Sequence, residues 1–510
     1  MIAVLQFDGV SLPHLDEFLT RSRLPTLARL RQAGHWFSLE TPVASWEGAT
    51  YYSLYSGKGV GEHGIYFPFM WDAAKQRVQS QDEYATPEPV WDRVGSIGVR
   101  SLVIDPYEGR EPKSLSGKAL SGWQFRHKVT LRSWSVPRHL DRQLKRRFGE
   151  PPLVEEVYGR PAAPYLFKLR DRLINAPKRA AKVAATLLSE ESFDLAWITM
   201  SSSHIAGHWF LDPSRLPQDQ FDTEMRSKLD ATLCDAYAAV DEALARIVEA
   251  LPATVDIIVL SPSSMGPNAS RTHLLPGMLQ AVLSEKSLET KTTKAAGSSL
   301  WRLRAAVPQR FRACVARVLP DRWTTAITAR LEMWGVDWTK TRAFMAPSGD
   351  CGYVRLNLRG RERDGVVNPE EAEMLLEQIA SGLRTFHDPD GKPAVEKIEF
   401  VSDSLGFGTL LHAFPDLIVH WSERLPPHLT GVHSPQFGEV ASVGWGSGRT
   451  GEHRDGAWAL IVPGSSKLKL PTKRPHVLDV VPTVCAALGV GADGLSGQAL
   501  LEPAMSTRHF

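Results

Sequence analysis

The chain has 510 residues, with 43% hydrophobic and 23% charged residues and a formal net charge of +2. This composition is typical of a globular protein with a large core, and the balanced charge gives no reason to expect a nucleic-acid partner. No apolar run reaches the roughly 18 residues that span a bilayer, and the first residues do not form a basic and apolar leader. We therefore expect a cytoplasmic protein without a membrane partner, although the sequence gives no signature of its oligomeric state.

Short apolar runs rich in β-branched residues recur along the chain, each four to eight residues long. Runs of this kind are typical of strands buried on both faces, and several are separated by segments with helical spacing. The alternation predicts an α/β fold with a mainly parallel central sheet flanked by helices. The predicted strands are Ile2–Phe7, Ser101–Asp105, Leu195–Met200, Asp256–Ser261, Asp416–Trp421 and Ala457–Val462.

Two segments interrupt this alternation. Residues 108–180 have an irregular, basic pattern that contains several prolines, and residues 268–340 have helical spacing without strand signals. We interpret residues 1–267 and 341–510 as one α/β core and residues 268–340 as a helical insertion. The insertion either caps the edge of the sheet or packs against the core.

The four cysteines, Cys234, Cys314, Cys351 and Cys485, are widely separated and form no C-x-x-C pair. This argues against a disulfide framework and against a thiolate zinc site. The basic stretch around Lys145 is either a solvated helix face or a patch that attracts an anionic group.

A helix after Asn368 has the clearest local signals. Asn368 suits the N-cap, Pro369 the first helical position, and Glu371 completes a capping box. The apolar positions that follow with helical spacing are Met374, Leu375, Ile379 and Leu383.

Polar residues follow three predicted strands directly. Asp8 comes after the first strand, residues 201–208 follow another, and residues 261–267 follow a third. Because ligands of open α/β sheets bind beyond the carboxyl ends of the strands, we expect these loops to converge on one edge.

The pair His204 and His208 is the strongest local indication of a metal ligand set. Residues four apart lie on one face of a helix, so both imidazoles can bind one ion. The alternative is two histidines at a helix end that are satisfied by hydrogen bonds. Asp8, before Gly9, is either a ligand or base at a strand end or a turn-forming Asp-Gly, and His453 alone resembles an ordinary loop residue.

Several sequence motifs form a recognisable set when they are taken together. They are residues 4–9, 24–30, 56–58, 62–65, 261–267, 336–344, 357–361, 413–417, 451–456 and 481–489. This set resembles the type I phosphodiesterase/nucleotide pyrophosphatase family of the alkaline phosphatase superfamily. The resemblance extends from end to end of the chain and implies the fold of that family.

The resemblance implies a site for two metal ions, usually zinc, about 4 Å apart. In the family one ion takes an Asp and a His four residues apart and a late His. The other takes the first-strand Asp, an Asp-His pair and the nucleophilic Thr or Ser. This chain keeps Asp8, His208 and His453, but His204 replaces the first Asp and Pro262-Ser263 replace the Asp-His pair.

The nucleophile position is also changed. Counting back from Ser56-Gly57 without gaps places Glu47 there, with Ser45 and Thr50 nearby. We therefore predict one divalent ion on His204, His208 and His453, with zinc first and iron or manganese as alternatives.

Glu47 is expected to bind the ion or to act as general base on a bound water. Asp8 is expected to support a histidine or to take part in catalysis, and Ser263, Ser45 and Thr50 to lie around the ion or the substrate.

Three functions compete on this evidence. The first is a single-metal hydrolase or transferase acting on an anionic phosphate, phosphonate or sulfate ester, and this substrate class is implied only by the family. The second is a redox enzyme with a non-haem ion on three histidines and a glutamate. The third is a non-catalytic binding protein that keeps the fold and an inactive pocket.

Overall fold

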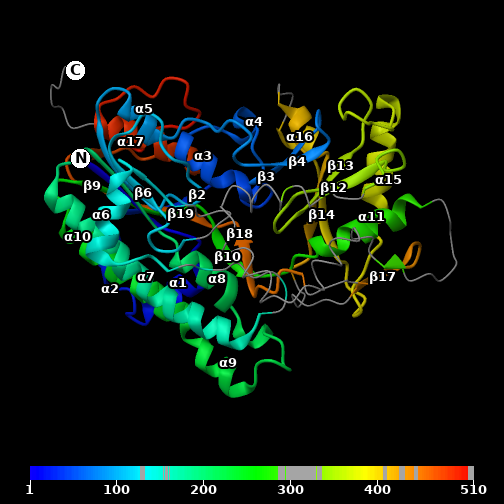
Figure 1. The fold of residues 1–510 in the computed structure, drawn as a ribbon, viewed down its shortest axis with the longest axis horizontal. Helices are drawn as coiled ribbons and strands as arrows, with labels where there is room; N and C mark the ends of the chain where they lie inside the picture. The colour runs from blue at the N-terminus through cyan, green and yellow to red at the C-terminus, as the bar shows by residue number, and fades with distance from the viewer. Residues whose placement is uncertain are drawn as a thin grey trace.

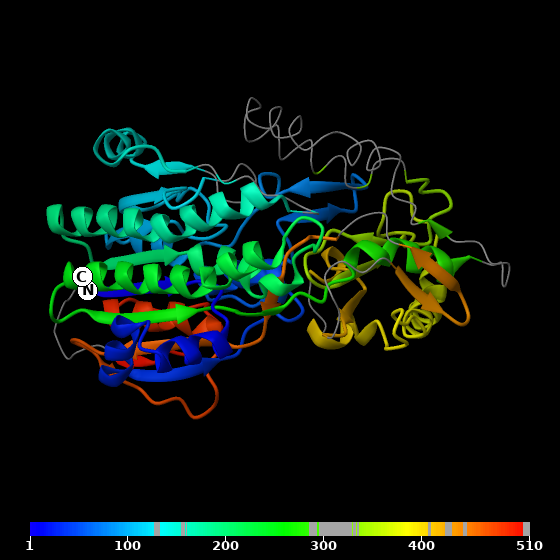
Figure 2. The same ribbon diagram turned by 90° about the horizontal axis from the view of Figure 1, so that it is seen from below.

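Two sheets organise the chain, a large one and a smaller one beside it (Figures 1 and 2). The computed structural model describes residues 1–126, 133–152, 154, 159, 161–284, 293–294, 329, 333, 336–405, 410–423, 431–441 and 446–502.

The large sheet is mostly parallel. Strands β9, β1, β8, β5 and β6 run in the same direction, whereas β19 and β7 run antiparallel to their neighbours. The expected fold class is therefore confirmed, with one correction of detail: the predicted strand at 457–462 is antiparallel. In order across the sheet the strands are β2 (His35–Leu39), β19 (Ala457–Val462), β9 (Asp256–Ser261), β1 (Ile2–Phe7), β8 (Leu195–Met200), β5 (Arg100–Ile104), β6 (Ser116–Ser121) and β7 (Trp134–Val136).

Helices cover both faces of this sheet, as the alternating side chains of its central strand require. Leu5 and Phe7 of β1 belong to the apolar cluster on one face, and Ile2 and Val4 belong to the cluster on the other. The helices of the first face are α1 (Leu12–Thr20), α2 (Pro25–Ala33), α6 (His139–Phe148), α7 (Ala163–Glu190) and α10 (Thr232–Glu249), and those of the second are α3 (Thr50–Ser56), α5 (Val90–Gly95) and α17 (Val480–Leu488).

The smaller sheet is antiparallel and has an apolar core of its own. The run predicted at 416–421 lies here, as β15, and not in the large sheet. Strand β15 is buried to the same extent as a strand of the parallel sheet. Its sequence therefore does not show which of the two sheets it belongs to. The strands in order are β12 (Ala343–Ala346), β13 (Gly352–Leu356), β15 (Leu417–Trp421) and β14 (Val395–Phe400), and α11 (Leu275–Leu283) and α15 (Ala372–Leu383) pack against them.

Smaller elements complete the described part of the chain. They are the helices α4 (Val60–His63), α8 (Ser202–Phe210), α9 (Thr223–Asp230) and α16 (Val401–Leu405), and the strands β3 (Phe69–Asp72), β4 (Arg77–Ser80), β10 (Ser264–Pro267), β11 (Thr293–Lys294), β16 (Gly431–Ser434), β17 (Gly438–Ala441), β18 (Gly451–Arg454), β20 (Lys467–Leu468) and β21 (Leu501–Glu502).

The segment 108–180, expected to be irregular, contributes β6 and β7 to the edge of the large sheet and two helices to one face. Strand β6 begins with Ser116, Gly117 and Lys118, and β7 has three residues, so neither shows a long apolar run. Most of the expected insertion at 268–340 lies outside the described residues, and α11 is its longest described helix.

The helix expected after Asn368 begins at Ala372, after a 3-10 turn over Pro369–Glu371. Leu375, Ile379 and Leu383 are buried as predicted, but Met374 is 70% exposed. Within the described ranges, no helix is both long and apolar enough to cross a membrane.

A buried carboxylate joins two helices of the first face. Asp241 of α10 accepts hydrogen bonds from the backbone nitrogens of Thr26 and Leu27, at 2.9 and 2.8 Å, in the first turn of α2. These two N–H groups have no acceptor within α2, so Asp241 supplies the cap that the helix itself lacks.

We expect Asp241→Ala to destabilise the protein by about 1.5–3 kcal/mol, because two buried donors lose a charged acceptor. The neighbouring Glu242→Ala, which removes an exposed ion pair with Lys178, is the control and should cost less than about 1 kcal/mol. The measurement is the urea midpoint of both variants, and equal shifts would contradict this role of Asp241.

Candidate metal centre

The candidate site lies at the carboxyl edge of the large sheet. Asp8 follows β1, α8 begins two residues after β8, and β10 begins three residues after β9. Strand β18 pairs with β10 so that His453 lies opposite Met265. Four segments that are distant in the sequence therefore meet at one edge, as expected for an open α/β sheet.

Three buried imidazoles meet at this edge. His204 and His208 both lie on α8, and their Nε2 atoms are 3.0 Å apart. The His453 ring centroid is 4.7 Å from that of His204 and 5.0 Å from that of His208. One nitrogen from each ring lies within 4.8 Å of the other two, so the three side chains are close enough to share one ion.

The outer nitrogen of each ring contacts a hydrogen-bonding partner. His204 Nδ1 lies 2.8 Å from Asp8 Oδ2, and His208 Nδ1 lies 3.0 Å from the Gly451 carbonyl oxygen. His453 Nδ1 lies 3.3 Å from Ser263 Oγ. A carboxylate and a carbonyl only accept, so His204 and His208 carry the proton on Nδ1 and present an Nε2 lone pair.

Two lone pairs 3.0 Å apart repel each other unless a proton or a cation lies between them. Burial holds the pKa of His208 well below its usual value, and the Arg449 charge lowers it further. Burial is also the main reason that the pKa of His453 lies well below its usual value. Neutral imidazoles with converging nitrogens fit a divalent ion such as zinc, whose nitrogen ligands are about 3.3 Å apart for tetrahedral bonds of 2.0–2.1 Å.

Asp8 is held in place by three neighbours. It accepts from Gln6 Nε2 at 2.8 Å, and Tyr51 Oη lies 3.0 Å from each of its two oxygens. Tyr51 Oη is also 3.1 Å from His204 Nδ1, and the Tyr107 ring lies 4.5 Å from the His204 ring. The contacts of Asp8 thus hold the His204 ring in place. The expected role of Asp8, support of a metal-bound histidine or a part in catalysis, stays a prediction.

A second group of possible ligand atoms shares His453 with the first. Glu47 begins a 3-10 turn over Glu47–Ala49, and its Oε1 is 3.9 Å from His453 Nε2. Its Oε2 accepts from the Asp350 nitrogen at 2.9 Å, and Asp350 Oδ2 accepts from the His453 nitrogen at 2.9 Å. Glu47, Asp350 and His453 therefore also form a candidate ligand group.

The two carboxyl groups affect each other. Burial raises the pKa of Glu47 well above its usual value, and the neighbouring Asp350 charge raises it further. Burial likewise raises the pKa of Asp350. A group that holds its proton unusually tightly is well suited to accept one during a reaction.

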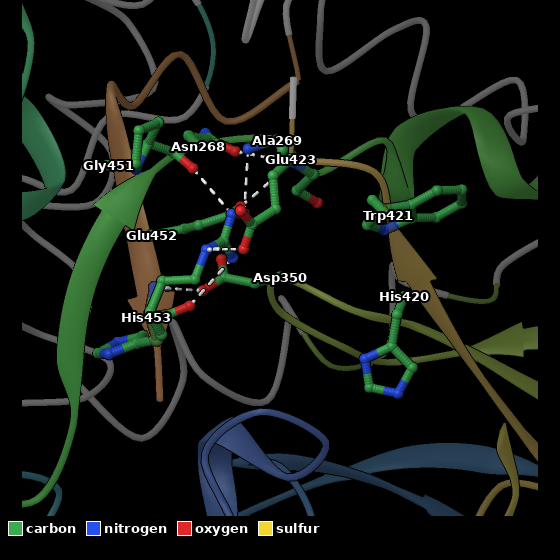
Figure 3. A network of polar contacts seen from close by, with 12 residues as sticks. Asn268, Ala269, Asp350, His420, Trp421, Glu423, Gly451, Glu452 and His453 are labelled. Carbon is green, nitrogen blue, oxygen red and sulfur yellow. Dashed lines mark hydrogen bonds and ion pairs between the residues drawn. The ribbon is translucent and has the colours of Figure 1, made fainter. Parts of the chain in front are cut away.

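A network behind β18 fixes this side of the site (Figure 3). Glu452 accepts from the backbone nitrogens of Ala269 and Ser270, at 3.0 and 3.1 Å, and pairs with Arg454 at 2.5 Å. Burial, followed by the Asp350 charge, raises the pKa of Glu452 to about 8. Its contacts tie β18 to the loop after β10, so they position the strand that carries His453.

Two predicted residues have their hydroxyls engaged elsewhere. Ser45 Oγ donates to Glu399 at 3.1 Å, in a cluster with His420, which stands apart from the Glu452 network in Figure 3. Thr50 Oγ1 donates to the Trp46 carbonyl oxygen, four residues earlier in the chain, at 3.4 Å. Neither hydroxyl has a described contact with the three histidines.

The sequence did not single out Tyr51, Asp350 or Arg449. Tyr51 lies four residues after Glu47, so helical spacing could have placed it near the same edge. Asp350 lies between β12 and β13 of the smaller sheet, and it reaches the site only because the two sheets pack together. No local pattern in the sequence could have indicated it.

Fold and site together define an alkaline phosphatase-like α/β protein with a cluster of side chains at its sheet edge that could hold a metal ion. The family model described as type I phosphodiesterase / nucleotide pyrophosphatase matches residues 2–399. The chain belongs to this family, a family of hydrolases, and the resemblance seen in its motifs is confirmed.

Solved structures support the fold. An inactive variant of murine ectonucleotide pyrophosphatase/phosphodiesterase 5 in complex with AMP is similar at 10% identity and a TM-score of 0.50, over 98% of this chain and 99% of that one. Phosphonoacetate hydrolase from Sinorhizobium meliloti 1021, in complex with phosphonoformate, is similar at 13% identity and a TM-score of 0.50, over 96% and 95%. A search of curated proteins finds no match.

Gly9 gives a test of how closely the site is packed. Its φ is +59°, and a Cβ at this position would lie 2.7 Å from the Cβ of His204. Gly489 is the matched control, because its φ is +70° and a Cβ there would meet nothing within 4 Å.

We expect Gly489→Ala to cost about 1 kcal/mol of stability through its backbone conformation alone. Gly9→Ala should cost more and should weaken zinc binding at least tenfold, because His204 must move. Zinc titration and urea denaturation of both variants are the measurements. Equal behaviour of the two would contradict the tight contact between Gly9 and His204.

Proposed function

We propose that this protein is a hydrolase that uses one divalent ion, held by His204, His208 and His453, to cleave an anionic phosphate, phosphonate or sulfate ester. The proposal depends on the 3.0 Å contact between the Nε2 atoms of His204 and His208. The Nδ1 atom of each ring already donates a hydrogen bond to an acceptor. Three histidines with an open fourth position are a known arrangement of catalytic zinc, and imidazole also suits iron.

A bound ion would polarise the ester and increase the acidity of a water molecule at the site. Glu47 is the residue proposed to take the proton from that water. Its carboxylate lies next to His453 and its pKa is raised by burial. Gly349 makes room for it, because a Cβ at 349 would collide with Glu47 Oε2.

Direct attack by water is favoured over a covalent intermediate. Glu47 stands where the family has its nucleophilic hydroxyl, and both nearby hydroxyls, of Ser45 and Thr50, bond elsewhere. Two similar structures are complexes with AMP and with phosphonoformate, which supports a phosphate or phosphonate group in the substrate.

Metal analysis is the first test. We expect about one ion per chain, and we expect its removal by a chelator to lower the unfolding free energy by roughly 2–4 kcal/mol, as for a ligand at 100–1,000 times its Kd. His204→Ala and His208→Ala should abolish this effect, whereas His139→Ala, on an exposed helix position, should keep it.

The same experiment separates the alternatives. A visible or paramagnetic spectrum from a redox-active ion would favour a redox enzyme over a hydrolase. Absence of bound metal, with unchanged stability of the two histidine variants, would favour a binding protein and would contradict the proposal.

Glu47→Gln tests the proposed base. We expect turnover of the preferred ester, chosen from a panel of nitrophenyl phosphates, phosphonates and sulfates, to fall 10²–10⁴-fold, the usual contribution of a general base. Metal content should stay intact, because three histidines remain.

Ser45→Ala, whose hydroxyl bonds to Glu399, is the control and should keep its activity. Loss of metal in Glu47→Gln would show that Glu47 is a ligand. Full activity in that variant would remove Glu47 from the mechanism.

A further inference from the structure

A turn between β5 and β6 brings an aromatic side chain against the histidine cluster. Tyr107 lies in this turn, and its ring centroid is 4.5 Å from that of His204, with an angle of 35° between the two ring planes. The Tyr107 ring is also 4.9 Å from the Tyr51 ring, whose Oη lies 3.1 Å from His204 Nδ1. The His204 imidazole is therefore bonded through Nδ1 to Asp8 and bordered by the ring of Tyr107.

The backbone of this turn adopts a conformation that its residues rarely take. The φ angle is +51° at Asp105 and +55° at Glu108, which is the left-handed region that favours glycine. Residues in this region carry strain, persist only where the surrounding structure fixes them, and are frequent at functional sites. The two strained positions stand on either side of Tyr107, so the strain lies where the chain presents this side chain to His204.

Hydrogen bonds fix the turn at two points. The Asp105 carboxylate accepts from the backbone nitrogens of Trp123 and Gln124, both at 2.8 Å, in the segment that follows β6. The Tyr107 carbonyl oxygen accepts from Tyr55 Oη of α3, at 3.1 Å. Tyr107 therefore projects from a backbone that is tied to two neighbouring elements.

A ring held beside His204 limits how that imidazole can turn. The Nε2 atoms of His204 and His208 lie 3.0 Å apart, so a small rotation of either ring would direct its lone pair away from a shared ion. A metal site works only when packing and hydrogen bonds hold its ligands within roughly 0.5 Å and 10–20° of the required geometry. Asp8 fixes one nitrogen of His204, and the Tyr107 ring restricts rotation about that hydrogen bond.

We infer that Tyr107 is a positioning residue that holds the His204 ring in the orientation that binds the ion; this rests on the proposed function. The contact is made by the aromatic ring, so phenylalanine would supply it and leucine would not. Tyr107 acts through His204 and is not itself a metal ligand.

The test compares ring and hydroxyl at this position. Zinc affinity is measured by competition with a chromophoric chelator, and ligand geometry by the visible spectrum of the cobalt(II)-loaded protein. Tyr107→Leu should change this spectrum and weaken zinc binding roughly 10–100-fold, the usual effect of losing a group that orients a ligand. Tyr107→Phe should stay within about threefold of wild type, because the ring remains.

Tyr84→Leu is the control for the loss of a tyrosine ring. Tyr84 is half-buried, its Oη donates to the carbonyl oxygens of Phe67 and Pro68, both at 3.2 Å, and it has no described contact with the three histidines. This variant should keep the wild-type zinc affinity within about twofold. Unchanged zinc affinity in Tyr107→Leu, or an equal loss in Tyr84→Leu or Tyr107→Phe, would overturn the role of Tyr107 and leave the metal site standing.

A measurement on the metal-free protein separates this inference from the proposed function. With ¹⁵N-labelled histidine, the Nδ1–H signal of His204 should be visible in the wild type and in Tyr107→Phe, and lost to exchange with water in Tyr107→Leu. If the wild type binds neither zinc nor cobalt, this signal decides. Its loss in Tyr107→Leu would uphold the positioning role while the proposed function fails, and its persistence there would overturn both.

Discussion

The site depends on the enforced approach of two acceptor nitrogens. His204 and His208 are held by Asp8 and by the Gly451 carbonyl, so neither ring can turn its proton inward without losing a buried hydrogen bond. Their Nε2 atoms nevertheless lie 3.0 Å apart in a site almost closed to solvent. A cation resolves the conflict, and the surrounding hydrogen bonds then serve to keep the rings ready for it.

The fold explains why this conflict arises at one place. Three adjacent parallel strands, β9, β1 and β8, end at the same edge, so Asp8 and α8 lie side by side there. Strand β18 adds His453 from a segment more than two hundred residues further along the chain. The smaller sheet closes the other side with Asp350, so the complete site requires both sheets.

The sequence predicted the parts of this arrangement that follow from periodicity. Buried strands were recognisable by their apolar runs, and the four-residue spacing of His204 and His208 placed both on one helix face. His453 could be singled out only through the family resemblance, because its local sequence is that of an ordinary loop. Asp350 and Arg449 come close to the histidines through packing between distant segments, which no local pattern records.

The positions at which the resemblance implies a departure from the family pattern lie around the same three rings. His204, where the resemblance implies an aspartate, has a nitrogen that could bind an ion. Ser263, where it implies part of an Asp-His pair, lies 3.3 Å from His453 Nδ1, and Glu47, where it implies a hydroxyl, lies 3.9 Å from His453 Nε2. Loss of function alone would not be expected to leave the replaced side chains in contact with the remaining histidines. Their common orientation favours a retuned metal centre, in which ligands of the second ion have given way to groups that orient and assist the first.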